Sequence, residues 1–302
     1  MTTTGTTTED RYPTRIGGEP ALLRREVPAV WPGRLREPFT PAELAAHAER
    51  GYSIVPSSVT EEELDLLRAE LDRLCADETL AADERVVREK ASGAVRSIFE
   101  VHRMSPLIAR LVRDPRVLDR ARQLLGSEVY VHQSRINCMP GFRGKGFYWH
   151  SDFETWHAED GMPVPRAVSL SLALTDNHPF NGGLMVMPGS HREFAQCAGA
   201  TPGDHYRDSL KEQQVGVPDE TTIARLAAAH GINQFTGPAG HALWFDANLM
   251  HGSADNITPY PRSNVFVVFN SVENTLREPY AAASPRPPFV AARDFTPLMP
   301  TH

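Results

Sequence analysis

The densest group of side chains able to do chemistry lies at residues 147–157, which read FYWHSDFETWH. His150 and Asp152 are two positions apart there, so on an extended strand both side chains point to the same face and could bind one metal ion. A third ligand must come from elsewhere, and His251 is the best candidate because it follows the apolar run 242–245 and opens the turn His251-Gly252-Ser253. Two imidazoles and one carboxylate leave three octahedral positions open, as in the non-haem Fe(II) oxygenases. The pattern therefore predicts His150, Asp152 and His251 as metal ligands and catalytic residues.

This ligand set alone does not decide the metal. Three protein ligands and a free position also describe catalytic zinc, and a His-x-Asp pair arises often by chance in a chain with 12 histidines. Arg262 favours iron, because it lies eleven positions after His251 at the head of the next apolar run. Its guanidinium could bind a dicarboxylate through two parallel hydrogen bonds, and Ser253 could donate a hydroxyl to the same carboxylate.

Other histidines are rival ligands. His157 is seven positions past His150, so on a continuous strand it faces the opposite side. His178 and His191 lie in turn-rich sequence. For these three, and for His230 and His241, we expect surface or supporting positions.

Helices are predicted before these motifs. Thr40 with Glu43, and Thr60 with Glu63, are capping-box patterns that start two helices. The second helix, 61–75, has an apolar face with leucines at spacings of three and four. A short strand is expected at 52–56 and a further helix at 106–125.

After Gly126 the chain changes to short β-like runs separated by turn formers, at 129–137, 167–175, 184–187, 242–245 and 264–270. A polar helical insertion is expected near 205–231, with Ile223, Leu226 and Ala227 on one face. Helices followed by many short strands indicate an α+β chain that is mainly β, in which a double-sheeted barrel carries supporting helices.

Composition limits the class of protein. Hydrophobic residues make up 41% and charged residues 23%, as in ordinary globular proteins, so a single domain over 16–302 is expected after a polar, Thr-rich and disordered start at 1–15. The net charge of -7 without a Lys/Arg run argues against nucleic acid. The absence of a long apolar run argues against a membrane span, and three scattered cysteines suggest a reducing cytoplasm.

The stretch 147–166, FYWHSDFETWHAEDGMPVPR, resembles the ectoine hydroxylases, a branch of the phytanoyl-CoA dioxygenase-like superfamily. The similarity continues through nearly the whole chain, in the segments YPTR (12–15), VHQSRIN (131–137), PGSH (188–191), GVPD (216–219), HGS (251–253), NITPYPRSN (256–264) and NSVEN (270–274). It implies a double-stranded β-helix (jelly-roll, cupin-like) core, and a cytoplasmic homodimer that converts the compatible solute ectoine into 5-hydroxyectoine. The cofactor would be Fe(II), with 2-oxoglutarate and O2 as co-substrates and succinate and CO2 as products.

The resemblance also implies roles for individual residues. His150, Asp152 and His251 match the iron ligands. The 2-oxoglutarate pocket would consist of Arg262, Ser253, Asn137 and Phe147, and the substrate contacts of Gln133, Thr155, Trp156, Ser169 and Phe269. Ectoine carries a cyclic amidine cation and a carboxylate, and an indole face such as that of Trp156 can bind a delocalised cation.

The chain departs from its relatives at two positions near this pocket. Many relatives have a Lys two residues after the position of Asn137, where this chain has Met139, and Glu where it has Gly146. Two other functions stay open: a dioxygenase of the same superfamily acting on another small cyclic amino acid, and a zinc hydrolase or non-catalytic metal-binding barrel.

Overall fold

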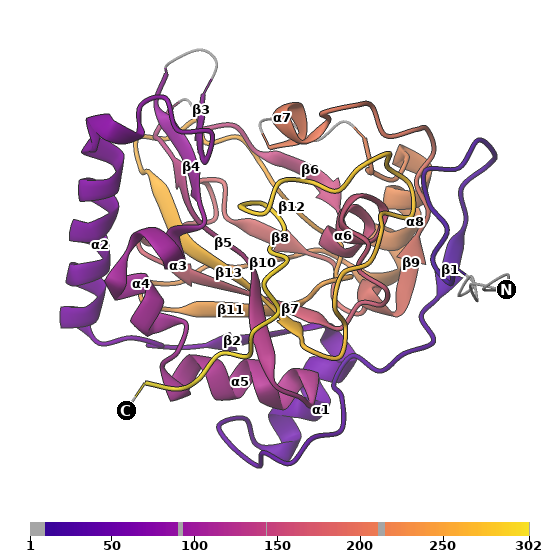
Figure 1. Cartoon of the computed structure of the whole chain (residues 1–302), viewed down its shortest axis with the longest axis horizontal. Helices are drawn as coiled ribbons and strands as arrows, with labels where there is room; N and C mark the ends of the chain where they lie inside the picture. The colour runs from indigo at the N-terminus through magenta and orange to yellow at the C-terminus, as the bar shows by residue number, and fades with distance from the viewer. Residues whose placement is uncertain (1–9, 90–92, 143, 211–214, 302) are drawn as a thin grey trace, which may run out of the picture.

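Two antiparallel sheets face each other across a pocket in the computed structural model, which describes residues 10–89, 93–142, 144–210 and 215–301 (Figure 1). The larger sheet has seven strands in the order β2-β11-β7-β13-β5-β4-β3. Their bounds are β2 (Tyr52–Val55), β11 (Ala242–Asp246), β7 (Ala167–Ala173), β13 (Arg262–Ser271), β5 (Val129–Met139), β4 (Val95–Phe99) and β3 (Val86–Arg88).

The smaller sheet has four strands in the order β10-β8-β12-β6. Its members are β10 (Asn233–Gln234), β8 (Leu184–Val186), β12 (His251–Ser253) and β6 (Phe147–His150), and a separate two-stranded sheet joins β1 (Leu22–Arg24) to β9 (Glu193–Ala195). From β5 to β8, and again from β10 to β13, successive strands alternate between the larger and the smaller sheet. This alternation produces the jelly-roll core, and the predicted fold class is confirmed.

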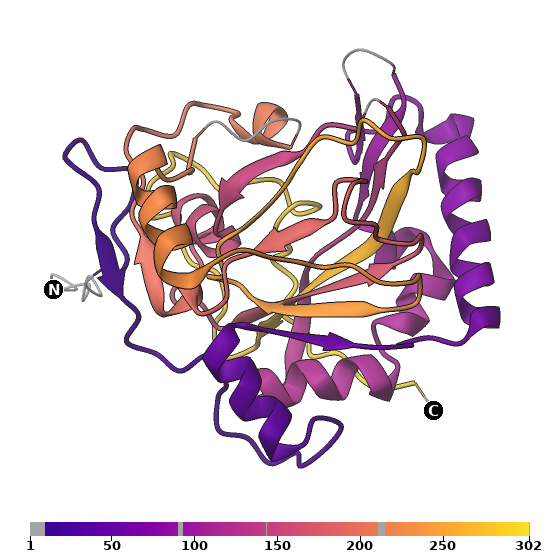
Figure 2. The same cartoon turned by 180° about the vertical axis from the view of Figure 1, so that it is seen from behind.

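Helices cover the outer face of the larger sheet, where α5 contacts β5, β7 and β13 (Figure 2). The helices before the barrel are α1 (Pro41–Arg50), α2 (Glu61–Ala76), α3 (Val101–Met104), α4 (Pro106–Leu111) and α5 (Pro115–Leu125), with the 3-10 turn η1 (Glu78–Leu80). Within the barrel sequence are α6 (Asp152–Asp160), the 3-10 turn η2 (Ser190–Arg192), α7 (Tyr206–Ser209) and α8 (Glu220–His230).

Both predicted capping boxes are present. The side chains of Thr40 and Thr60 accept hydrogen bonds from the backbone N–H of the third residue of α1 and α2. That residue is Glu43 or Glu63, and its carboxylate accepts a hydrogen bond from the backbone N–H of the threonine. The prediction of one helix over 106–125 is wrong, because α4 ends before Asp114. Pro115 disfavours a helical conformation in the residue before it, and Asp114 is extended there and caps α5 instead.

Apolar side chains form separate cores on the two faces of the larger sheet. In β7, Val168, Leu170 and Leu172 pack with the helices, whereas Ala167 and Ala173 belong to the core between the sheets. The expected insertion at 205–231 contains α7 and α8, with 211–214 outside the described residues. Leu226 is buried in a small core, and Ile223 and Ala227 pack against it, as the sequence predicted.

The expected disordered start is wrong for residues 10–15, while residues 1–9 lie outside the described part of the chain. Tyr12 is 1% exposed and packs on Phe153 and Phe194. Arg15 is also buried, and its guanidinium contacts the carboxylates of Glu154 and Glu159 at 2.7 and 3.0 Å. Composition suggested disorder because the partners of these side chains are more than a hundred positions away.

Of the helices described, none is long and apolar enough to cross a bilayer.

Candidate metal centre and pocket

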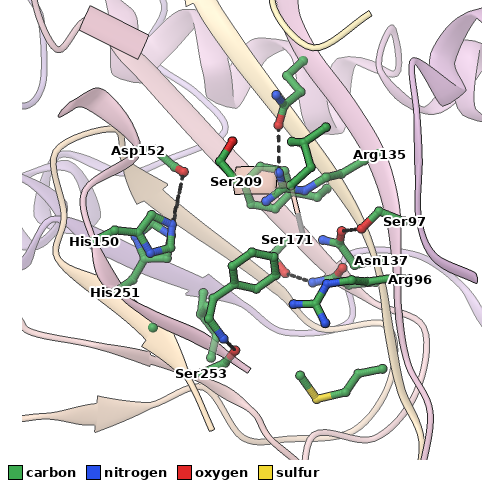
Figure 3. Close-up of a pocket in the computed structure, with 18 of the residues that line it drawn as sticks. Arg96, Ser97, Arg135, Asn137, His150, Asp152, Ser171, Ser209, His251 and Ser253 are labelled. Atoms are coloured by element: carbon green, nitrogen blue, oxygen red, sulfur yellow. Dashed lines mark hydrogen bonds and ion pairs between the residues drawn. The ribbon is translucent and has the colours of Figure 1, made fainter. Parts of the chain in front are cut away.

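Three side chains that the sequence singled out converge at the edge of the smaller sheet (Figure 3). His150 ends β6 and His251 begins β12, and the two residues are paired directly across these antiparallel strands. The two-residue spacing predicted that Asp152 lies on the same strand as His150, but Asp152 is the first residue of α6. The extended Ser151 connects strand to helix, so the carboxylate still reaches the same side as both imidazoles.

The distances within this group suit a metal ion. His150 Nε2 lies 3.6 Å from Asp152 Oδ1, and His251 Nε2 lies 3.8 Å from Asp152 Oδ2. One ligand atom from each residue falls within 4.8 Å of the others, and all three residues are buried. These separations exceed direct hydrogen bonds and leave a space that an ion with ligand distances of about 2 Å can occupy.

Hydrogen bonds orient both imidazoles toward that space. Nδ1 of His150 lies 2.7 Å from the Tyr148 carbonyl oxygen, and Nδ1 of His251 lies 2.9 Å from that of Leu249. A carbonyl oxygen only accepts, so each Nδ1 carries the proton and each Nε2 has a free lone pair. Asp152 Oδ2 is buried without a hydrogen-bond partner among the described residues. An orphaned carboxylate oxygen beside two lone pairs fits a divalent cation.

The charges agree with this interpretation. Burial alone would raise the pKa of Asp152, but the neighbouring His251, His150 and Arg135 lower it to about 2, so the carboxylate is ionised. Burial and the neighbouring His150 lower the pKa of His251 to about 4, so its imidazole is neutral at pH 7. Ionised carboxylate and neutral imidazole are the forms that bind metal.

The pocket beside this group extends between the two sheets to Arg262. Arg262 begins β13, opposite Met139 of β5, and its Nε is buried without a hydrogen-bond partner in the described part of the chain. Burial, together with the Arg96 guanidinium, lowers the pKa of Arg262 to about 10. A half-buried cation with an unpaired N–H favours an anionic ligand.

The other predicted co-substrate residues line the same pocket. Ser253 Oγ accepts a hydrogen bond from the Phe147 backbone N–H at 3.0 Å, and Asn137 Oδ1 accepts one from Ser97 Oγ at 2.9 Å (Figure 3). The Arg96 guanidinium lies over the Phe147 ring, 4.5 Å from its centroid. The structure thus places Asn137, Phe147, Ser253 and Arg262 around one cavity.

Three of the five predicted substrate residues also border the pocket, namely Gln133, Thr155 and Trp156. Gln133 Nε2 donates to the Val290 carbonyl oxygen at 2.6 Å, which fixes the side-chain amide. Trp156 is 3% exposed, one turn of α6 after Asp152, with its ring edge-on to His132.

Ser169 and Phe269 do not line this pocket, in contrast to their predicted role. Phe269 belongs to the helix-side core and stacks on Trp244 at 6.0 Å. Ser169 is fully buried in β7, two positions before Ser171, which does line the pocket. The register of β13 turns the Phe269 ring to the helix side, whereas Ser169 shares the inner face of β7 with Ser171 but lies beyond the residues that border the pocket.

The rival histidines are outside the metal group. His157 and His191 are fully buried rather than at the surface: His157 lies 2.9 Å from an Asp10 carboxylate oxygen, and His191 Nε2 lies 3.1 Å from the Ala48 carbonyl oxygen. His178 stacks on Phe180, His230 lies 3.7 Å from a Glu193 oxygen, and His241 Nδ1 accepts from the Ser57 N–H.

Sequence reasoning missed three pocket arginines. Arg135 stacks over Phe266 at 4.3 Å and donates from Nη1 to Gln133 Oε1 at 3.0 Å. Its position midway between Gln133 and Asn137 on one strand face was a usable signal. Arg286 lies far along the chain and binds Asp160 through two hydrogen bonds of 2.8 and 2.6 Å. Neither Arg286 nor Arg96 carries a local signal of this role.

Both departures from the relatives border the pocket region. Met139 lines the pocket at the Arg262 end. A Cβ atom on Gly146 would lie 2.1 Å from the Ser253 carbonyl oxygen, so a side chain at this position would require the backbone to move.

Comparisons with known proteins place these features in context. The family model for phytanoyl-CoA dioxygenase (PhyH) matches residues 48–264. Ectoine dioxygenase from Nocardia farcinica is 61% identical over 289 residues, which cover 96% of this chain and 95% of that protein. EctD from S. alaskensis, solved with 2-oxoglutarate and 5-hydroxyectoine, is 43% identical with a TM-score of 0.88, covering 97% of this chain and 98% of that one. The same protein with bound Fe has a TM-score of 0.87, with the same identity and coverage.

Proposed function

The chain belongs to the phytanoyl-CoA dioxygenase family, and from this premise we propose that its pocket hydroxylates ectoine to 5-hydroxyectoine, consuming 2-oxoglutarate and O2 and releasing succinate and CO2. The observation that carries the proposal is the position of a half-buried arginine, Arg262, whose Nε is buried without a hydrogen-bond partner among the residues that the structure describes, in the same pocket as the His150-Asp152-His251 group. A hydrolytic zinc site has no need for a second, dicarboxylate-binding end.

His150, Asp152 and His251 hold Fe(II) through two Nε2 atoms and a carboxylate oxygen. Bound there, iron supplies with 2-oxoglutarate and O2 the oxidising power to hydroxylate a C–H bond. The protein keeps both imidazoles neutral and correctly turned through the carbonyl oxygens of Tyr148 and Leu249.

Arg262 binds the distal carboxylate of 2-oxoglutarate at the far end of the pocket. Its planar fork can donate two parallel hydrogen bonds, and Ser253 can add a third from its hydroxyl. Phe147 covers the carbon chain, while Asn137, fixed by Ser97, presents its amide N–H2 to the pocket. This arrangement orients the keto acid toward the metal ligands.

Ectoine lies between Trp156 and Arg135. The indole of Trp156 attracts the delocalised amidinium of the ring, and Arg135 pairs with the carboxylate. Burial lowers the pKa of Arg135 to about 10, and a substrate anion offsets that unfavourable burial. Gln133 and Thr155 hydrogen-bond the polar edge of the ring, so that one ring carbon faces the metal.

The test is anaerobic reconstitution with Fe(II) and 2-oxoglutarate, followed by exposure to air with ectoine and mass spectrometry of the product. We expect a gain of one oxygen atom in ectoine, matched by succinate. Proline serves as the control for another cyclic amino acid. Succinate without hydroxylated ectoine would keep the dioxygenase reaction and exclude this substrate, whereas no succinate with any substrate would overturn the proposal.

The chain would work in the cytoplasm as a homodimer, as its resemblance to the ectoine hydroxylases implies. Light scattering after gel filtration measures the assembly, and a monomer at working concentrations would contradict it.

A further inference from the structure

Two cysteines from distant parts of the chain meet behind the co-substrate end of the pocket. Cys75 lies in the last turn of α2 and Cys138 is the next-to-last residue of β5. They are 63 positions apart in sequence, yet their Sγ atoms are 3.9 Å apart. Both are free thiols at partly buried positions, whereas Cys197 is buried elsewhere. The hydroxylation reaction uses none of the three.

The position of Cys138 connects this pair to the pocket. Cys138 and its neighbours Asn137 and Met139 all border the pocket, and successive side chains of a strand point to opposite faces. The Cys138 side chain accordingly packs with Cys75 against the helix-side core. Across the sheet, Met139 is paired with Arg262. A change at Cys138 therefore acts on the strand end that borders the proposed carboxylate site.

We infer that Cys75 and Cys138 are a site of reversible oxidation, at which hydrogen peroxide joins them in a disulfide that ties α2 to β5. The Cys75 thiolate attacks one peroxide oxygen, the O–O bond breaks, and Cys75 becomes a sulfenic acid, while the departing hydroxide takes up the proton that Cys75 had released and forms the first water. The Cys138 thiol then attacks the Cys75 sulfur, the S–O bond breaks and a second water leaves. Two thiols are oxidised, and one peroxide is reduced to two waters.

The surroundings favour Cys75 as the attacking sulfur. Its hydrogen bond with Cys138 lowers the pKa of Cys75, against the opposing effects of burial and of the Asp72 carboxylate, while Arg88 makes a smaller contribution in favour of the thiolate. The hydrogen bond with Cys75, together with burial, raises the pKa of Cys138. Cys138 is thus the resolving thiol, since the thiolate is the form that reacts with peroxide.

Disulfide formation has a predictable effect on the pocket. The two sulfurs are 3.9 Å apart, and an S–S bond is about 2 Å long. They must therefore approach each other by about 2 Å. The approach draws the end of β5 toward α2, moving Asn137 and Met139 away from the co-substrate. The affinity for 2-oxoglutarate should fall, whereas Gln133 and Arg135, further back along β5, move less. This effect rests on the proposed function, but the formation of the disulfide does not.

The experiment uses the Fe(II)-loaded protein without oxygen, treated with diamide, which oxidises thiols and spares the iron. Free thiols are then alkylated in denaturant, and peptides are analysed by mass spectrometry. We expect a Cys75–Cys138 linked peptide that dithiothreitol removes, with Cys197 alkylated throughout. Calorimetric titration should give a Kd for 2-oxoglutarate that rises roughly tenfold on oxidation and returns on reduction.

Cys75→Ser and Cys138→Ser are the matched controls, with Cys75→Ala as a second variant at the more accessible thiol. None of them should form the linked peptide or change its Kd on treatment. Absence of the linked peptide in the wild type would overturn the inference, as would an equal response of Kd in Cys75→Ser. An unchanged Kd in the linked protein would overturn the effect on the pocket. If 2-oxoglutarate binds neither form, the proposed function fails, and the linked peptide still decides the oxidation site.

Discussion

Replacing Arg262 by Gln should separate ligand binding from stability. Arg262 is a half-buried cation, and partial desolvation together with the Arg96 guanidinium lowers its pKa to about 10. Each pKa unit corresponds to about 1.4 kcal/mol, so keeping this charge in the ligand-free pocket destabilises the folded protein by roughly 3 kcal/mol. A buried Gln amide in its place costs about 1–3 kcal/mol. The substitution should therefore leave the stability of the ligand-free protein unchanged or slightly increased.

The affinity for 2-oxoglutarate, in contrast, should fall. Hydrogen bonds to charged groups contribute about 1.5–3 kcal/mol each, and Gln replaces a charged fork by a neutral amide. A loss of about 3 kcal/mol raises the Kd of 2-oxoglutarate by roughly a hundredfold. Calorimetric titration of the anaerobic Fe(II) protein measures this Kd. Thermal unfolding with and without 2-oxoglutarate measures stability, and the shift of about 2.7 kcal/mol that a ligand gives at a hundred times its Kd should nearly vanish in the variant.

Arg96→Gln is the matched control, because it removes a second guanidinium, that of the buried Arg96, from the same pocket. Arg96 Nη1 lies 2.7 Å from Glu89 Oε1, and both side chains are largely buried. Removing one partner of such a pair typically costs about 3–5 kcal/mol. Arg96→Gln should thus lower the melting temperature, while Arg262→Gln does not. An equal fall in both variants, or an unchanged Kd in Arg262→Gln, would refute the assignment of Arg262 as the carboxylate-binding residue.

Four further substitutions test the site and its support. Asp152→Ala should remove iron, measured by metal analysis, and abolish hydroxylation; retained turnover would show that the ligand assignment is wrong. Trp156→Ala should reduce kcat/KM for ectoine about thirtyfold, from a desolvated cation-π contact of about 2 kcal/mol, without changing iron content; loss of iron would indicate a structural role. Arg15→Gln should lower the free energy of unfolding by about 3–5 kcal/mol, because two carboxylates stay buried without their partner; a change below 1 kcal/mol in urea unfolding would contradict this. Burial lowers the pKa of His47 to about 4, so the folded protein binds a proton at this imidazole less readily than the unfolded chain does. Up to ~3 kcal/mol of stability is therefore lost as the pH falls from about 6.5 to 4. His47→Gln should flatten that loss in urea titrations at several pH values, and an unchanged pH dependence would exclude His47 as its source.

The local parts of this site were predictable from the sequence because their signals are local. Thr40 and Thr60 act on backbone groups three positions away, so their capping patterns could be read directly. The spacing of His150 and Asp152 also predicted a shared ligand face, although the reason was wrong. The pair is joined by a strand end and a helix start, and the carboxylate reaches the metal side from the first turn of α6.

The rest depends on contacts between distant segments. Arg286 approaches Asp160 across 126 positions, and Arg96 of β4 lies over Phe147 of β6, which belongs to the opposite sheet, so residue type and spacing say nothing about either contact. For Phe269 the sequence predicted a pocket contact that the structure does not have. It occurs in an apolar strand on which either face is buried, and only the register of β13 decides that its ring packs on Trp244 instead of facing the pocket.

Helix α6 explains why the distant contacts matter for chemistry. It carries Asp152 in its first turn and Trp156 one turn later, so the spacing between a metal ligand and the substrate-binding indole is set by helix geometry. Arg15 binds Glu154 in the first half of the helix, and Arg286 binds Asp160 at its end. These ion pairs are almost fully buried, so the helix cannot shift without leaving an unpaired charge in the interior. Residues near the N-terminus, which composition assigned to a disordered start, thus hold in place the helix that joins the metal site to the substrate site.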